Sequence, residues 1–144
     1  MENNKTKLKI NLDGFDDLEH ARNSVISFCR HYCNNVEEID VLEMAILEAC
    51  HNALCYGSKR KSKSLCELKL YYDNKSIKAI VTNYGKAYEV LEKDSFSIDQ
   101  DFLQYKNGGL GIPLIKSLMD SVEYSRKSNN KNELIIVKKI NNKQ

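Results

Sequence analysis

Alternating apolar and polar residues predict several strands along the chain. In the first four segments every second residue is apolar, which is the pattern of a strand with one buried face. The fifth segment follows a predicted turn at residues 129–132. The two central segments lie on either side of Asp73-Asn74-Lys75-Ser76, a run typical of a tight turn, and therefore predict a hairpin. The predicted strands cover residues 8–12, 66–72, 77–81, 122–124 and 134–140.

Apolar residues that recur every three or four positions predict helices between these strands. The first helix begins at Asp16 or Asp17, either of which can cap it. The second runs from Glu37 to Tyr56, and Gly57 ends it as a C-cap glycine would. A third helix has Pro113 in its first turn. The apolar line of the first helix is Ala21, Val25, Phe28, Cys29 and Tyr32.

Helices and hairpins in this order predict an α/β (α+β) fold. We expect a single domain over residues 1–144, built as a two-layer sandwich with a mixed, mainly antiparallel sheet and helices on one face. Residues 1–6 and 141–144 are polar and are expected to be disordered.

The composition, 42% hydrophobic and 29% charged, is that of a globular protein. A net charge of +2 gives no nucleic-acid footprint. No apolar run approaches the roughly 20 residues of a membrane-spanning helix, and the polar N-terminus has no signal region, so we expect a cytoplasmic protein without a membrane partner.

The five cysteines form no C-x-x-C pair. Cys29 and Cys33, with His31 and His51 elsewhere, are conceivable zinc ligands. We interpret the cysteines instead as reduced thiols packed as small hydrophobes.

Glu48 and Asn52 lie four residues apart on the second predicted helix. This spacing puts a carboxylate and a carboxamide one turn apart, at the edge of the buried face. Such a pair can hold a water or a metal-bound phosphate. The same pair is also common on solvated helix faces, so the pair alone leaves both interpretations open.

A glycine cluster, Gly108-Gly109-Leu110-Gly111-Ile112-Pro113, leads into the third predicted helix. Glycine lets backbone N–H groups approach a phosphate closely, and a helix N-terminus favours anions. The N–H groups of Leu110, Gly111 and Ile112 should point at the phosphates. The cluster is not a P-loop, and by itself a plain loop fits it equally well.

Asn83-Tyr84-Gly85 ends one of the predicted strands. Together with Glu48/Asn52 and the cluster at 108–113, it resembles the G1, N and G2 boxes of the GHKL (Bergerat-fold) ATPase/kinase superfamily. The chain from about Lys7 to Ile140 is similar to that superfamily's bacterial anti-sigma factor serine/threonine kinases.

The resemblance implies an ATP- and Mg²⁺-dependent enzyme. Asn52 would be the magnesium ligand and Glu48 the general base. The adenine-binding aspartate of the G1 box is Asn83 here, Gly85 is retained, and Ala87 stands in place of the second glycine. We hypothesise that Glu133 supplies a compensating acceptor near the adenine.

The resemblance also implies a sigma factor and a small anti-anti-sigma (STAS-type) protein as partners, and a homodimer formed through the first helix and its neighbouring strand. Arg22 on this helix is the candidate partner contact, and residues 89–107 are expected to form a lid. Three alternatives stay open: a non-catalytic partner-binding regulator on the same fold, a detached histidine-kinase domain, and a zinc enzyme.

Overall fold

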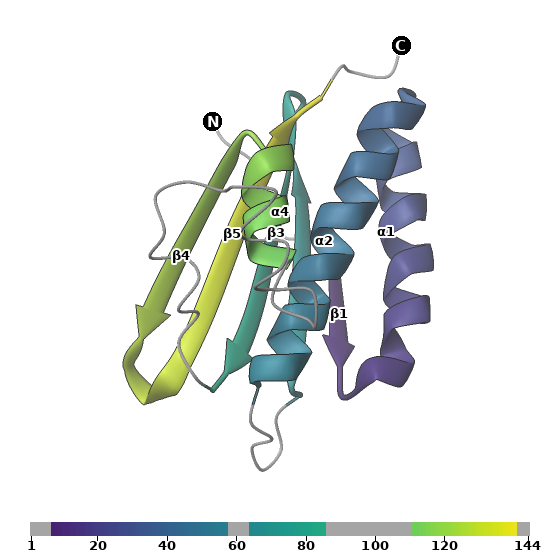
Figure 1. The fold of residues 1–144 in the computed structure, drawn as a ribbon. Helices are drawn as coiled ribbons and strands as arrows, with labels where there is room; N and C mark the ends of the chain where they lie inside the picture. The colour runs from purple at the N-terminus through teal and green to yellow at the C-terminus, as the bar shows by residue number, and fades with distance from the viewer. Residues whose placement is uncertain (1–6, 58–63, 86–110, 141–144) are drawn as a thin grey trace.

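The computed structural model describes residues 7–57, 64–85 and 111–140 (Figure 1). Two long helices, a short one and five strands form these ranges, with two single-turn 3₁₀ helices between them. The helices are α1 (Leu18–Tyr32), α2 (Val36–Tyr56) and α4 (Gly111–Leu118), and the strands are β1 (Leu8–Leu12), β2 (Cys66–Tyr72), β3 (Ser76–Tyr84), β4 (Ser121–Lys127) and β5 (Lys131–Lys139).

The strands form one sheet in the order β1-β2-β3-β5-β4, and each described pairing is antiparallel. The helices cover one face of this sheet (Figure 1). The predicted two-layer α+β fold is therefore confirmed. The sheet was expected to be mixed and mainly antiparallel, and all its described strands are antiparallel. Within these ranges, the helices are too short or too polar to cross a membrane.

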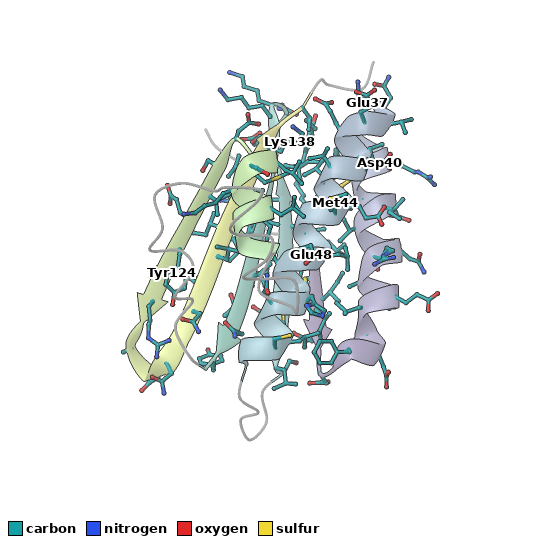
Figure 2. The ribbon with its side chains drawn as sticks, in the orientation of Figure 1. Glu37, Asp40, Met44, Glu48, Tyr124 and Lys138 are labelled. Atoms are coloured by element: carbon teal, nitrogen blue, oxygen red, sulfur yellow. The ribbon has the colours of Figure 1, made fainter. Side chains whose placement is uncertain are left out.

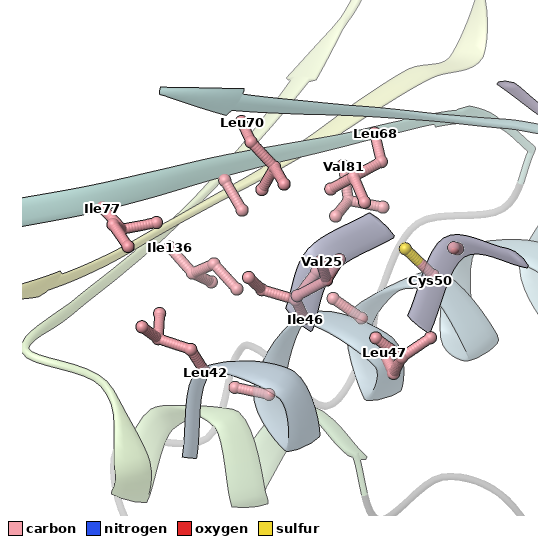
Figure 3. Close-up of a cluster of buried hydrophobic side chains, with 14 of the residues drawn as sticks. Val25, Leu42, Ile46, Leu47, Cys50, Leu68, Leu70, Ile77, Val81 and Ile136 are labelled. Atoms are coloured by element: carbon pink, nitrogen blue, oxygen red, sulfur yellow. The ribbon is translucent and has the colours of Figure 1, made fainter. Parts of the chain in front are cut away.

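The core lies between the two layers. Figure 3 shows side chains of α1 and α2 meeting those of β2, β3 and β5. α1 buries the first four residues of its predicted apolar line. The fifth, Tyr32, is half-buried and stacks on Tyr72 of β2 with ring centroids 3.9 Å apart. Leu42 and Ile46 of α2 are fully buried, as the predicted helical face requires.

The starts of α1 and α2 differ from the sequence prediction. Asp17 precedes α1, but its carboxylate does not cap that helix. It accepts a hydrogen bond from the N–H of Asp13 at 2.8 Å, closing the loop that leaves β1. α2 is capped by Asn35, whose Oδ1 accepts from the N–H of Glu38 at 2.9 Å. An Asx side chain at this position satisfies one of the free N–H groups of a helix start.

Two hairpin turns depend on asparagines with positive φ. Asn74 (φ 79°) lies in the β2–β3 turn, where Asp73 Oδ1 accepts from the N–H groups of Lys75 and Ser76. Asn129 and Asn130 (φ 64° and 62°) turn the chain between β4 and β5. Because the second turn is complete at Asn130, β5 begins at Lys131, three residues earlier than predicted.

Gly57 follows α2, as predicted, but not in the left-handed conformation of a C-cap glycine. Its φ of −71° and ψ of 146° are extended. The position requires glycine because of space: a Cβ here would lie 2.7 Å from the carbonyl oxygen of Ala53 and 3.1 Å from that of Leu65. Gly57 also forms an antiparallel bridge with Gly85, so the end of α2 and the end of β3 are in close contact.

We expect Gly57→Ala to lower the free energy of unfolding by about 1–3 kcal/mol, because the added methyl group must displace two backbone carbonyls. Gly14→Ala is the matched control: Gly14 is extended and has no atom within 4 Å of an added Cβ. That change should leave stability unaltered or raise it by up to about 1 kcal/mol. Urea denaturation of both variants measures the difference, and equal stabilities would contradict the close approach at Gly57.

Candidate functional site

The ends of several elements converge at one end of the sheet. Asn83, near the end of β3, donates from Nδ2 to the carbonyl oxygen of Ala53 in the last turn of α2 at 3.0 Å. Asn83 is also the cross-strand partner of Asn132, near the start of β5. These contacts bring the C-terminal end of α2 against the two central strands.

α4 begins at this end of the sheet and runs away from it. Asp120, just after the helix, donates its N–H to the carbonyl of Val137 at 3.0 Å, which places the C-terminal end of α4 beside the end of β5. The N-terminal end, at Gly111, therefore points toward the start of β5, and α4 packs along α2 (Figure 1).

Asn52 is the one described polar side chain that is buried without a hydrogen-bond partner. Its relative exposure is 0%, and neither Oδ1 nor Nδ2 bonds to any described part of the chain. An unsatisfied buried amide costs about 1–3 kcal/mol. A side chain kept at this cost, next to the converging element ends, is suited to binding a ligand.

Glu48 lies one turn before Asn52 on α2 and is half-buried. Figure 2 shows it in line with Glu37, Asp40 and Met44 along one face of the helix, beside α4. Within the described residues its carboxylate makes no hydrogen bond or ion pair. The carboxylate and the carboxamide lie one turn apart, but only Glu48 is at the edge of the buried face as expected, because Asn52 is fully buried.

Asn83 has a structural reason to be an amide. Ala53 is among the last four carbonyls of α2, which an α-helix leaves without an intrahelical donor. Only a donor can satisfy such a carbonyl, so Nδ2 must face it and Oδ1 is the accepting atom of the side chain. A carboxylate at this buried position would put oxygen against oxygen, so the contact with the end of α2 suits an amide.

Glu133 does not lie on the same face of the sheet as Asn83. Strand residues alternate between faces, and the cross-strand partner of Glu133 on β3 is Thr82, whereas that of Asn83 is Asn132. Glu133 instead lies 3.8 Å from the amino groups of both Lys127 and Lys131. The geometry therefore does not support the hypothesis that Glu133 compensates for Asn83. The residue beside Asn83 on β5 is Asn132.

Several predicted residues lie at or beyond the limits of the described ranges. Ala87, Gly108, Gly109, Leu110 and the expected lid at 89–107 are outside them. Gly111 and Ile112 begin α4, so the glycine cluster does lead into a helix as predicted. Gly85 donates its N–H to the carbonyl of Asn130 at 2.9 Å.

Three polar residues of the site were missed from the sequence. Asn132 is fully buried, and its Oδ1 accepts from Tyr124 Oη at 2.5 Å and from Arg126 Nη1 at 2.9 Å. Alternation with Leu134 and Ile136 was a signal for Asn132, because it continues the buried line of β5 backward. No comparable signal marked Tyr124 or Arg126.

The predicted partner and zinc residues are placed as follows. Arg22 is exposed and pairs with Glu43 of α2 at 3.5 Å. His51 packs beside Phe15 (5.3 Å between ring centroids), and its Nδ1 lies 3.8 Å from Cys55 Sγ. Nowhere in the described ranges do three or more His, Cys, Asp or Glu side chains form a group that could hold a metal ion.

The sequence model of the histidine kinase-like ATPase domain family matches residues 15–138, so the chain belongs to this family. The superfamily expected from the three boxes is thereby confirmed. Two relatives carry more particular names. The anti-sigma F factor of Clostridium acetobutylicum is 26% identical over 138 residues, covering 94% of each chain. The serine-protein kinase RsbW of Bacillus pumilus is 31% identical over 99 residues, covering 64% of this chain and 60% of its own.

A solved structure has the same fold. It is the SiaB-SiaC complex from Pseudomonas aeruginosa, in which the matching chain has a TM-score of 0.64 at 9% sequence identity, with 94% of this chain and 91% of that chain covered. At this identity the likeness concerns the fold alone.

We expect opposite stability effects from two near-isosteric changes. Asn52→Leu should raise the free energy of unfolding by about 1 kcal/mol or more, because it removes an unsatisfied buried amide. Asn83→Leu should lower it by about 1–3 kcal/mol, because it leaves the Ala53 carbonyl without its donor. Thermal and urea denaturation without nucleotide measure both. A loss of stability for Asn52→Leu as large as that for Asn83→Leu would show that Asn52 is already satisfied in the folded protein.

Thiol labelling tests the interpretation of the cysteines. Burial, with lesser effects of Cys33 and Glu43, raises the pKa of Cys29 to about 12. The hydrogen bond to Cys66, together with burial, raises the pKa of Cys50. Since the thiolate is the reactive form, iodoacetamide at neutral pH should label only the exposed Cys55 in the native protein. Mass spectrometry identifies the labelled residue, and native labelling of Cys29 or Cys50 would contradict this.

Proposed function

We propose that this protein is a cytoplasmic anti-sigma factor with ATP-dependent serine/threonine protein kinase activity. It would phosphorylate an anti-anti-sigma protein of the STAS type, and phosphorylation would decide which partner it holds. The buried amide of Asn52 carries this proposal, because the described part of the chain offers it no hydrogen-bond partner. The names of the two relatives support the partner class.

The residues present fit ATP with Mg²⁺. Asn52 Oδ1 offers the neutral oxygen that a magnesium ion accepts while it keeps waters and phosphate oxygens as its other ligands. When bound, the ion neutralises charge that develops on the transferring phosphoryl group. The start of α4 at Gly111 directs backbone N–H groups toward an anion. Asn83 Oδ1 would accept from the adenine amino group with a neutral oxygen.

Glu48 would act as the general base. Its carboxylate accepts the proton of the attacking serine hydroxyl as that oxygen approaches the phosphorus. Two observations suit this role: Glu48 lies one turn from Asn52, and within the described residues no cation neutralises it. Its half-buried position at the rim leaves room for a substrate side chain to approach.

The partner surfaces differ from the expectation in one respect. The apolar line of α1 is buried in the core and cannot form a dimer interface. The outward side of α1 instead borders a groove of mixed polar and apolar lining next to edge strand β1. A homodimer would use this groove, and Arg22, exposed beside Glu43, stays the candidate contact for a protein partner. The groove is lined by Lys7, Leu8, His20, Asn23, Ser24, Ser27, Phe28, His31 and Tyr32.

A second candidate function is a non-catalytic regulator that binds the same partners and has lost ATP. The role of Asn83 favours it: an amide that holds the end of α2 offers adenine a weaker, uncharged acceptor than a carboxylate. Glu48 and Asn52 favour retained chemistry, because partner binding requires neither of them at this rim.

Calorimetry with ATP and Mg²⁺ distinguishes the two. We expect micromolar binding by the wild type, loss of binding in Asn52→Leu, and retained binding in Glu48→Gln. Phosphate transfer to a STAS-type protein should fall by about 10²-fold or more in Glu48→Gln, the usual contribution of a general base. Glu37→Gln, which removes an exposed carboxylate from the same face of α2, is the control and should behave as wild type.

The absence of ATP binding by folded wild-type protein would exclude the kinase and leave the non-catalytic regulator. ATP binding by the wild type without phosphate transfer to the STAS-type protein would exclude the kinase activity and leave the nucleotide site intact.

A further inference from the structure

The helices cover one face of the sheet (Figure 1), and a polar cavity of about 270 Å³ lies on the other. Asn11 of β1 is the cross-strand partner of Glu67 of β2, which is in turn the partner of Thr82 of β3. Cross-strand partners lie on the same side of a sheet, and these three alternate with residues of the core. The lining residues include Lys9, Asn11, Ser64, Glu67, Thr82 and Lys131.

Three of these side chains have hydrogen-bonding groups that the described part of the chain leaves unused. Asn11, Ser64 and Thr82 make no side-chain hydrogen bond within it. Thr82 is the most buried of the lining residues, with a relative exposure of 8%. Unlike the enclosed amide of Asn52, its hydroxyl opens to the cavity. It therefore offers a donor and an acceptor to a molecule that enters there.

Lysines outnumber carboxylates around the cavity. Glu67 lies 3.1 Å from Lys9 Nζ and 3.5 Å from Lys69 Nζ, so two ammonium groups already surround its carboxylate. Lys131 adds a third ammonium group to the lining. A small anion that binds between these side chains therefore meets positive charge, with the carboxylate of Glu67 neutralised.

The one ion pair of Lys131 within the described residues is shared. Its amino group lies 3.8 Å from Glu133, and the amino group of Lys127 lies at the same distance from the same carboxylate. One carboxylate neutralises only one of these two lysines. With Lys9, Lys69 and Glu67, the group has four lysines against two glutamates, an excess of two positive charges.

The cavity and the candidate nucleotide site lie back to back on the same two strands. Thr82 faces the cavity, whereas its neighbour Asn83 faces the helices. On β5 the same relation holds for Lys131 and Asn132. A layer of backbone separates the two places, so a ligand in one of them does not contact the other.

We propose that this cavity binds a small metabolite through a phosphate or carboxylate group, separately from the candidate nucleotide site. The anionic oxygens would accept from Lys131 Nζ and from the hydroxyl of Thr82, since hydrogen bonds between charged partners are the strong ones. Lys131 lies two residues before Glu133, the cross-strand partner of Thr82, and such diagonal neighbours are within reach of a long side chain. Asn11 and Ser64 would bond to the polar remainder of the molecule.

The volume limits the size of the ligand. Pockets for drug-sized molecules measure about 300–1,000 Å³. A cavity just below this range suits a small metabolite rather than a nucleoside triphosphate.

NMR titration of the ¹⁵N-labelled full chain tests the site, with inorganic phosphate as one probe and succinate as the other. We expect saturable shifts of the Thr82 and Lys131 amides with at least one probe, and the tighter probe identifies the anionic group. Lys131→Met should weaken this binding about tenfold, the effect of one hydrogen bond to a charged group. Thr82→Val, which keeps the shape and removes the hydroxyl, should weaken it about threefold or more.

Lys127→Met is the matched control. It removes the same charge from a lysine that pairs with the same carboxylate at the same distance but does not line the cavity, so it should keep the wild-type affinity. Circular dichroism and melting curves check that every variant is folded.

Three outcomes would overturn the inference. The first is the absence of saturable binding of either probe. The second is an equal loss in Lys127→Met and Lys131→Met, because binding would then follow overall charge alone. The third is a set of shifts at Asn52 and Gly111 in place of Thr82 and Lys131, which would assign the anion to the candidate nucleotide site. ATP takes no part in the test, so failure of the proposed kinase activity would leave this inference standing.

Discussion

The candidate site depends on one buried hydrogen bond, from Asn83 Nδ2 to the carbonyl oxygen of Ala53. It joins positions 30 residues apart in the sequence and fixes the last turn of α2 against the end of β3. Asn52 and Glu48 lie on the two turns of α2 just before this contact, so their position relative to the sheet follows from it. The space occupied by Gly57 is limited by the same carbonyl.

This bond also gives Asn83 a structural reason to be an amide. Here the amide has a partner that only a donor can satisfy, and its neighbour Asn132 is held by Tyr124 and Arg126. Each of these two amides therefore has an orientation determined by its own contacts.

Much of the fold was predictable because burial is periodic. The alternation in Cys66–Tyr72 and the apolar face of α2 each reflect one buried side, so the hairpin and the long helix were placed close to their true bounds. The spacing of Glu48 and Asn52 followed from helical geometry alone. Each of these features depends on residues that are close together in the sequence, so a short stretch of sequence is enough to predict it.

The errors lie where polar residues have long-range partners. Asn132 lies in an asparagine-rich segment whose composition is typical of a turn. Its hydrogen bonds with Tyr124 and Arg126 allow it to be buried in β5 instead. This misplaced the start of the strand and led to the choice of Glu133, one residue away and therefore on the opposite face. Asp17 was predicted to cap the first helix for a related reason, since the partner of a capping side chain cannot be told from composition.

The buried amide of Asn52 has a consequence for the amount of this protein in a cell. A ligand that satisfies this group binds only the folded chain, and such a ligand shifts the balance between folded and unfolded molecules toward the folded form. Proteases remove mainly unfolded molecules, so changes of about 1–2 kcal/mol alter abundance several-fold. If nucleotide fills the site, the lifetime of the protein would follow the energy charge of the cell, independently of any phosphate that it transfers.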